Sequence, residues 1–379
     1  MMLAEPAAGQ FAPDDPHQDP SITIAENAQD AFLLRRLLKG RQFTFFGRLE
    51  GEFALYDIPA LADEDGAELR RFRLGLAGLN PWFENISHKV EFDYSDGSGN
   101  ISDAYFAIDL GQRGSLTIGN QDGSLSLSAS TGSLSQLFME SPLPISAFGL
   151  SKRVGVAYDR FAERTGIHLL LFGRDFNDKE AAHSGLTLRA YVNPYRSAGG
   201  VWHLGASVVR ENFDEGAHLR ARPESFVTDI RLVDTGVRED VERSTRLGIE
   251  AAGALGSFTT RLELLANEWQ RLDGPRNRFA GAYLEGGYFL TGEPFSYRDG
   301  KFVRPALERG QNAWELAYRY SWVDLNDGDV QGGEERNLGL ALNYYPAPRA
   351  RGQLNLIQVN SAPVGGDGLL FQARIQLNW

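Results

Sequence analysis

The chain has no cysteine, and no stretch of it approaches the ~18 consecutive apolar residues that a membrane-spanning helix requires. Without cysteine there is neither a disulfide scaffold nor thiolate chemistry at a metal or redox centre. A formal net charge of −12 lacks the basic excess typical of proteins that bind nucleic acid. These absences exclude a disulfide-rich domain and a helical membrane protein, and they argue against nucleic acid as a partner.

Alternation of apolar and polar residues is abundant instead, most clearly at the C-terminus. A period of two places successive side chains on opposite faces of a strand. A strand with one apolar face that ends on an aromatic residue is typical of an outer-membrane β-barrel. In lipid every backbone polar group must be paired within a closed sheet, so the rest of the chain should supply a barrel. The apolar positions of this last strand are Leu369, Phe371, Ala373, Ile375, Leu377 and Trp379.

Similar segments recur along the chain and are separated by clusters of Gly, Pro, Asp and Asn. They predict an all-β fold, a 16-stranded antiparallel transmembrane β-barrel with a constriction loop folded inward. An even count places both ends of the barrel sheet on one side. The segment from Ser225 to Val233 fits a strand or part of a loop. The expected strands are 43–56, 69–80, 85–95, 101–110, 114–119, 151–160, 165–174, 184–193, 200–210, 242–253, 257–269, 279–291, 312–323, 336–346, 350–359 and 368–379.

Two parts are expected: residues 1–41 as a periplasmic leader and 42–379 as the barrel. The leader should contain a short helix from Asn27 to Gly40, packed near the barrel mouth or binding a partner. Residues 1–20 have no apolar core of a secretory signal, so a mature or trimmed form is expected.

Basic residues fall on the polar face of many different segments. In the segment 312–323, Trp314 and Tyr318 should face lipid, whereas Glu315 and Arg319 should face the lumen. The same alternation predicts a lumen lined by guanidinium and ammonium groups, which match anions well. The alternative is that Arg71 and Arg73 only neutralise lumen carboxylates such as Glu50, Glu52 and Glu91. The candidate ion path consists of Arg71, Arg73, Lys89, Arg246, Arg261, Arg319 and Arg374.

A long interruption, residues 120–150, separates the fifth and sixth strands. A structureless loop of this length is uncommon and usually functional. It begins with a tract of Ser and Gly and continues with an apolar cluster, which favours folding inward against the barrel wall and narrowing the pore. A second connection, 211–241, carries Arg220, Arg222, Arg231 and Arg238 and could also approach the lumen. In the first loop the residues expected at the constriction include Phe138, Met139, Pro142, Pro144 and Phe148.

From Phe43 to Trp379 the chain resembles the family of phosphate-selective porins O and P of Gram-negative outer membranes. The resemblance implies a sixteen-stranded homotrimeric channel that passes phosphate or related anions past inward Arg and Lys. It rests on several short motifs taken together. These are Arg70-Arg71-Phe72-Arg73-Leu74-Gly75-Leu76, Asp103-Ala104-Tyr105, Leu137-Phe138-Met139-Glu140-Ser141-Pro142-Leu143-Pro144 with Ala147-Phe148, Gly287-Tyr288-Phe289-Leu290-Thr291-Gly292-Glu293 and Trp314-Glu315-Leu316-Ala317-Tyr318-Arg319-Tyr320-Ser321.

One departure from the family pattern concerns the start of the constriction loop. Where the family has a Lys soon after the fifth strand, this chain has Gly119-Asn120-Gln121-Asp122. A carboxylate at Asp122 would replace an ammonium near the expected narrowest point, which bears on phosphate selectivity because an anion filter depends on positive side chains.

The sequence therefore predicts a passive outer-membrane porin for small anions, phosphate or polyphosphate-like, with no cofactor, no metal and no catalysis. Its expected partners are outer-membrane lipid and lipopolysaccharide, the permeant anions and further copies of the chain in a homotrimer. Three alternatives remain open: a general or differently selective pore, a barrel-borne enzyme, and a soluble multi-sheet binding protein. None of the familiar nucleophile, phosphate-loop or zinc-helix motifs occurs, and the six His residues are scattered without ligand spacing. The tract Asp63-Glu64-Asp65 is expected to be a solvated loop face, with a Ca²⁺ site as the alternative.

Overall fold

A computed structural model describes residues 43–379, apart from 81, 84, 96–97, 124, 178–182, 306, 309 and 363–365. The predicted leader and its helix from Asn27 to Gly40 lie outside the described residues. No helix in the described part of the chain is long and apolar enough to cross a membrane.

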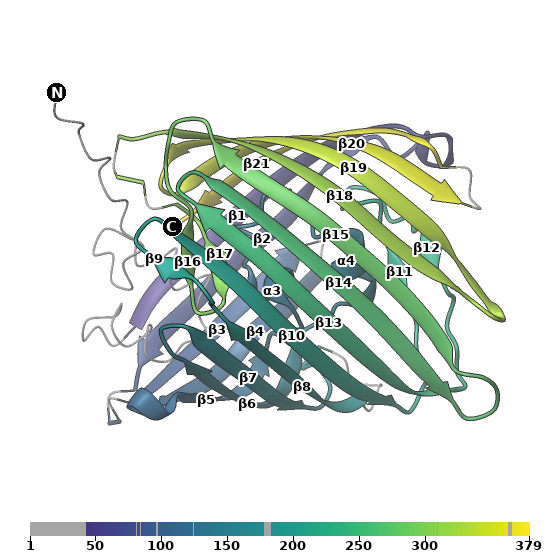
Figure 1. Cartoon of the computed structure of the whole chain (residues 1–379), viewed down its shortest axis with the longest axis horizontal. Coiled ribbons are helices and arrows are strands. Elements are labelled where there is room, and N and C mark those ends of the chain that lie inside the picture. The colour runs from purple at the N-terminus through teal and green to yellow at the C-terminus, as the bar shows by residue number, and fades with distance from the viewer. Residues whose placement is uncertain are drawn as a thin grey trace.

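Sixteen long antiparallel strands form one closed sheet within the described residues, and every predicted strand is confirmed (Figure 1). Consecutive strands pair with each other, and β1 pairs with β21 to close the cylinder. The two-residue β9 (Arg196–Ser197) pairs antiparallel with the start of β10. The wall strands are β1 (Phe43–Asp57), β2 (Gly66–Leu79), β3 (Ile86–Ser95), β4 (Ser98–Asp109), β5 (Ser115–Gln121), β6 (Arg153–Phe161), β7 (Thr165–Phe172), β8 (His183–Val192), β10 (Gly200–Phe213), β13 (Val241–Leu255), β14 (Phe258–Arg271), β15 (Asn277–Phe289), β18 (Ala313–Asp327), β19 (Val330–Ala347), β20 (Ala350–Ala362) and β21 (Gly368–Asn378).

The wall alternates as an outer-membrane barrel must, with apolar side chains outside and polar ones inside. On β18, Trp314 and Tyr318 are 38% and 39% exposed, while Glu315 and Arg319 are 2% and 1% exposed. Trp379 is 42% exposed on the outer face, as predicted. The pattern continues on β19, the neighbour of β18, where Leu338 and Leu340 face outward.

A β-bulge in β2 breaks this alternation at one functionally important place. Glu50 of β1 pairs with Arg71, but the next residue of β1, Gly51, pairs with Leu69, so Arg70 is the extra residue. A bulge locally cancels the period of two, which lets two consecutive side chains point to the same face. Arg70 therefore reaches Glu140 of the inward loop, 2.8 Å away, although strict alternation would place it in lipid.

Three connections enter the barrel. From the end opposite the chain's C-terminus come the loop between β5 and β6, with α3 (Leu127–Ser130) and α4 (Leu143–Phe148), and the loop between β10 and β13. The latter carries the small hairpin β11 (Arg220–Ala221) and β12 (Val233–Asp234), while most of 225–233 is not a strand. From the C-terminal end comes the hairpin β16 (Ser296–Arg298) and β17 (Lys301–Val303), which the sequence did not predict. The 3-10 turns η1 (Pro59–Leu61) and η2 (Gly111–Arg113) lie in short connections.

Candidate functional site

The loop between β5 and β6 is held to the wall by close packing of its apolar residues. Pro144 lies against Gly281 of β15, where a Cβ would be 2.6 Å from the Pro144 Cβ. Phe138 lies over Gly339 of β19 and beneath the Arg319 guanidinium, whose carbon is 4.3 Å from the ring centre. Phe138, Met139, Pro142, Pro144 and Phe148, the residues predicted at the constriction, are all buried, and Phe138 and Pro144 pack against glycines of the wall.

Arginines of the wall also bind the main chain of this loop. Arg374 of β21 donates to the Met139 carbonyl at 2.6 Å, and Arg351 of β20 donates to the Gln136 carbonyl at 2.6 Å. Arg319 donates to the Glu140 carbonyl at 2.8 Å. Carbonyls that have no partner in a helix or sheet are thus satisfied by charged donors, which form stronger hydrogen bonds than neutral ones. Arg319 and Arg374 therefore position the loop in addition to carrying charge.

Each of the seven predicted ion-path cations lies on the inner face and has a carboxylate partner. Because burying an unpaired charge is costly, a paired arrangement is what a narrow lumen favours. The geometry agrees with the alternative that these cations neutralise lumen carboxylates. The pairs are Arg71–Glu50 at 2.5 Å, Arg73–Asp93 at 2.7 Å, Lys89–Asp103 at 2.6 Å, Arg246–Glu211 at 2.8 Å, Arg261–Glu285 at 3.3 Å, Arg319–Glu285 at 2.8 Å and Arg374–Glu140 at 2.5 Å.

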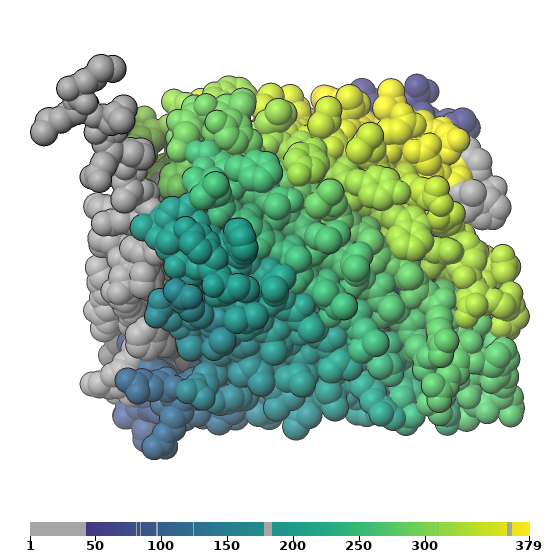
Figure 2. Space-filling model, viewed as in Figure 1, coloured from purple at the N-terminus to yellow at the C-terminus, as the bar shows by residue number. Residues whose placement is uncertain are grey.

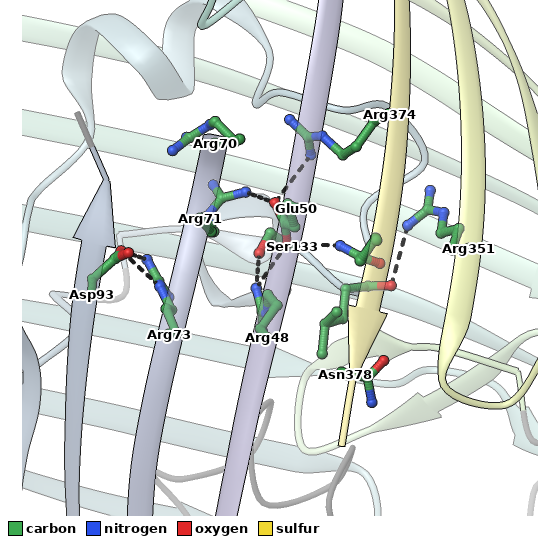
Figure 3. A network of polar contacts seen from close by, with 12 residues as sticks. Arg48, Glu50, Arg70, Arg71, Arg73, Asp93, Ser133, Arg351, Arg374 and Asn378 are labelled. Atoms are coloured by element: carbon green, nitrogen blue, oxygen red, sulfur yellow. Dashed lines mark hydrogen bonds and ion pairs between the residues drawn. The ribbon is translucent and has the colours of Figure 1, made fainter. Parts of the chain in front are cut away.

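Glu50 is the centre of one such network (Figure 3). Arg71, Arg374 and Arg48 converge on its carboxylate, and Arg48 also donates to the Ser133 hydroxyl at 2.5 Å. Ser133 belongs to the Ser- and Gly-rich edge of the loop. Arg48 was not among the predicted site residues, although it has the same alternation parity on β1 as Glu50.

Asp122 at the start of the loop has a cationic neighbour from the other end of the same loop. Lys152 lies 2.9 Å from Asp122 and 2.6 Å from Asp103 of β4. Burial alone would lower the pKa of Lys152, but Asp103 and then Asp122 outweigh it, and the pKa is raised above its usual value. An ammonium is therefore present near Asp122, although the sequence places it thirty positions away from the family's lysine.

A groove of about 680 Å³ opens beside the loop, on the side of the β10–β13 connection. We call it the mouth groove. Phe226 lies between two guanidinium groups in it, with the Arg70 and Arg222 carbons 3.6 and 3.8 Å from its ring centre. The charged lining consists of four arginines, Arg70, Arg220, Arg222 and Arg231, against the two glutamates Glu140 and Glu224.

Two of the mouth-groove arginines are ion-paired, Arg70 with Glu140 at 2.8 Å and Arg222 with Asp229, whereas no ion pair to a described carboxylate is found for Arg220 or Arg231. Burial and then the neighbouring Arg222 and Arg220 lower the pKa of Arg231, and this effect outweighs the opposing effect of Asp229 and Asp234. The one hydrogen bond described for the Arg231 side chain goes to the Asp229 main-chain oxygen, at 2.8 Å. From the sequence alone, Arg220, Arg222 and Arg231 are expected only to belong to a connection that could approach the lumen.

A His–Asp pair and an acidic tract are the other candidate sites in the described residues. His168 and Asp159 form a pair on neighbouring strands with 2.7 Å between Nδ1 and Oδ1, yet no described serine or threonine hydroxyl is hydrogen-bonded to this imidazole. In the acidic tract Asp65 accepts from the Tyr56 amide and Glu64 from the Thr228 hydroxyl. In the described part of the chain no group of three or more His, Asp or Glu side chains could hold a metal ion.

A closed sixteen-stranded cylinder with an apolar outer face, a charged lumen and inward loops defines an outer-membrane channel. The sequence profile of "phosphate-selective porin O and P" matches residues 43–379, and the chain belongs to this family. It is also 31% identical, over 344 residues, to an uncharacterized protein of Caulobacter vibrioides, covering 83% of this chain and 68% of that protein.

Solved outer-membrane structures share the fold at low sequence identity. A loop-deletion form of OmpT, an outer membrane protein of Vibrio cholerae, has a TM-score of 0.60 at 15% identity, covering 89% of this chain and 99% of that chain. An anion-selective porin from Comamonas acidovorans has a TM-score of 0.53 at 12% identity, with the same coverage of 89% and 99%. The outer membrane channel DcaP of Acinetobacter baumannii has a TM-score of 0.55 at 12% identity, covering 89% and 97%. The location of the chain is thus the bacterial outer membrane.

Proposed function

We propose that the channel conducts small anions down their gradient, with phosphate and polyphosphate-like ions as its preferred solutes, and that it does so without covalent chemistry. The observation that carries this proposal is the mouth groove, whose arginines outnumber its carboxylates. Cations that neighbouring acids do not neutralise attract anions and raise their local concentration. Guanidinium forks also match phosphate oxygens and stay charged at any physiological pH.

The paired cations deeper in the lumen would form the later part of the anion path. A channel must bind its ion weakly and at several sites so that the ion can leave. Arg71, Arg73 and Lys89, each shared with a carboxylate, provide such moderated sites along the wall of β2 and β3. The family name and the anion-selective neighbour from Comamonas acidovorans support the same direction of selectivity.

A homotrimer is the proposed assembly. One solved neighbour, the OmpT of Vibrio cholerae, is described in a trimer form. Native mass spectrometry of the chain extracted in mild detergent should give the mass of three copies, and a monomer at all detergent concentrations would contradict this part of the proposal.

Reversal potentials across a planar bilayer test the selectivity. In a KCl gradient we expect anion preference, and phosphate or pyrophosphate added to one side should reduce the chloride current. The double variant Arg220→Gln/Arg231→Gln should lower the anion-to-cation permeability ratio severalfold. Arg336→Gln is the matched control, because Arg336 is exposed on the outer face and already paired with Glu334 at 2.6 Å. Cation preference in the unmodified protein would leave only a general pore.

A further inference from the structure

The outer wall of the barrel has a groove that the channel does not use. It crosses β6, β7, β8, β10 and β13 and encloses about 720 Å³, within the range of pockets that hold an organic ligand. Its strands form part of the wall turned toward the viewer in Figures 1 and 2. Glycines at 155, 173 and 185 contribute to the lining, between the larger outward side chains of Val156, Leu171 and Leu186. The base of the groove is therefore apolar and open to lipid.

Two arginines stand at the rim of this groove on the same outer face. Arg210 lies near the end of β10, where it is exposed and pairs in register with Leu186 and Thr245. Arg243 of β13 donates to the side-chain oxygens of Asn212 at 2.9 Å and Gln270 at 3.0 Å. Both acceptors are neutral. Among the described residues no carboxylate forms an ion pair with either arginine, so their charge is not compensated by the protein there.

Other outward arginines at this end of the barrel are arranged differently. Arg336 is paired with Glu334 at 2.6 Å, and Arg276 and Arg278 both pair with Glu268 at 2.8 Å. Arg210 and Arg243 thus differ from the arginines nearby. An arginine on the lipid face costs about 2–4 kcal/mol at the bilayer midplane but only about 0–1 kcal/mol near an interface, so outward arginines near strand ends, such as these two, are expected close to the lipid head groups.

The position of the groove along the barrel indicates which leaflet it meets. It lies where β6 and β8 begin and where β7 and β10 end, at the end that bears the two longest inward loops. Outer-membrane barrels have short turns on the periplasmic side and longer loops outside. The two arginines therefore face the outer leaflet, and a phosphate group is the anionic partner that a guanidinium fork fits best.

We propose that this groove binds one outer-leaflet lipid with a phosphorylated sugar head group, the lipid A portion of lipopolysaccharide. An acyl chain lies over Val156, Leu171 and Leu186, and a head-group phosphate accepts from Arg210 and Arg243. The proposal rests on the membrane location of the chain and is independent of the ion that it conducts. The site would tie the barrel to its leaflet through its outer wall, away from the solute path.

Native mass spectrometry of the full chain in detergent, with purified bis-phosphorylated lipid A as the probe, tests this site. The unmodified protein should retain one lipid A per chain, and Arg210→Ala/Arg243→Ala should weaken retention by about tenfold or more, given roughly 1 kcal/mol for each basic residue at an anionic lipid surface. Arg336→Ala should retain lipid A as the unmodified protein does. Heat-modifiable migration in SDS gels confirms that each variant is folded. Equal retention by the double variant, or equal loss in Arg336→Ala, overturns the proposal.

Two further arms separate a lipid from other occupants. Dephosphorylated lipid A should bind the unmodified protein only as weakly as bis-phosphorylated lipid A binds the double variant. Millimolar inorganic phosphate should not displace the bound lipid. Displacement by phosphate alone would make the groove a plain anion site and overturn the lipid assignment. Because the chain has no cysteine, Leu171→Cys reports contact between copies. Disulfide-linked pairs in native membranes would show that a second copy covers the groove, which also overturns the proposal.

Discussion

Gly47 and Trp379 close the barrel by exchanging both of their main-chain hydrogen bonds, each at 3.1 Å. The Trp379 ring also covers Gly47 so closely that a Cβ on this glycine would lie 2.3 Å from a ring carbon. The seam between β1 and β21 therefore ends with an aromatic side chain that covers Gly47 of the first strand. A glycine is required at position 47 because of this packing, and its backbone conformation is not the reason.

Gly47→Val should consequently weaken the seam. The ring must rotate away and lose its packing on the strand, and because it is half-exposed and can move toward lipid the cost should lie below the roughly 1–3 kcal/mol of overpacking in a closed core. The thermal midpoint of the barrel, followed by loss of heat-modifiable migration, should fall. Gly51→Ala, on the same strand, is the control, because a Cβ there meets nothing within 4 Å. A similar loss in both variants would mean that the strand only needs small residues.

A second prediction concerns the seat of the inward loop at Gly281. Gly281→Ala places a methyl group 2.6 Å from the Pro144 Cβ and 2.9 Å from the Trp322 main-chain oxygen, so the loop must move into the lumen. We expect a smaller single-channel conductance and a lower thermal midpoint. Gly352→Ala, where a Cβ meets nothing within 4 Å, should leave both unchanged. Unchanged conductance in Gly281→Ala would show that the loop does not narrow the pore.

The third prediction is a pH dependence set by Lys152. Its pKa is raised because Asp103 and Asp122 together outweigh the effect of burial. A raised pKa in the folded state means that the stabilisation is complete below the ordinary value of 10.5 and is lost as the pH rises through the higher folded value. Between about pH 6 and 9 the stabilisation by Lys152 should therefore be constant, because Lys152 does not titrate there. This stabilisation should be lost only in strong alkali. The alkaline part of the loss should be smaller in Lys152→Gln, and an identical pH profile in the variant would contradict the assignment.

A fourth prediction addresses the free edge of the loop at Ser133. Arg48→Ala removes the donor to the Ser133 hydroxyl and one cation beside Glu50. The loop edge should become more mobile, so single-channel recordings should show more open-channel noise and a lower anion preference. Ser133→Ala removes the hydrogen bond but keeps the cation, and it should raise the noise without changing the reversal potential. Equal reversal potentials in all three proteins would mean that the permeant ion does not sense Arg48.

The strands were predictable because each satisfies lipid on one face and water on the other, so that alternation in the sequence maps directly onto the wall. The outward Trp314 and inward Arg319 illustrate this. Where a bulge interrupts the alternation of apolar and polar residues, the sequence did not predict which face a side chain occupies. Arg70 was assigned no role because a bulge changes facing by a single inserted residue, and nothing in the local composition indicates the bulge.

Pairing between distant segments was the other limit. The carboxylate partners of the lumen cations come from different strands and loops, as with Arg246 and Glu211, so they depend on strand register and loop path. The hairpin of β16 and β17 was missed for a related reason. Its apolar residues, such as Phe302 beneath the Arg261 guanidinium, gain their burial from the wall that they enter, and the connection alone does not show it.

Two of the connections that enter the cylinder from opposite ends contact each other. Arg304, just beyond β17, donates to the Leu134 carbonyl at 3.3 Å, and Arg351 of the wall donates to the same oxygen at 3.2 Å. A solute therefore passes a constriction to which connections from both ends of the barrel contribute. Shortening the connection that carries β16 and β17 would remove the Arg304 donor from the β5–β6 loop. The constriction therefore cannot be widened from the C-terminal end of the barrel without disturbing the loop that enters from the opposite end.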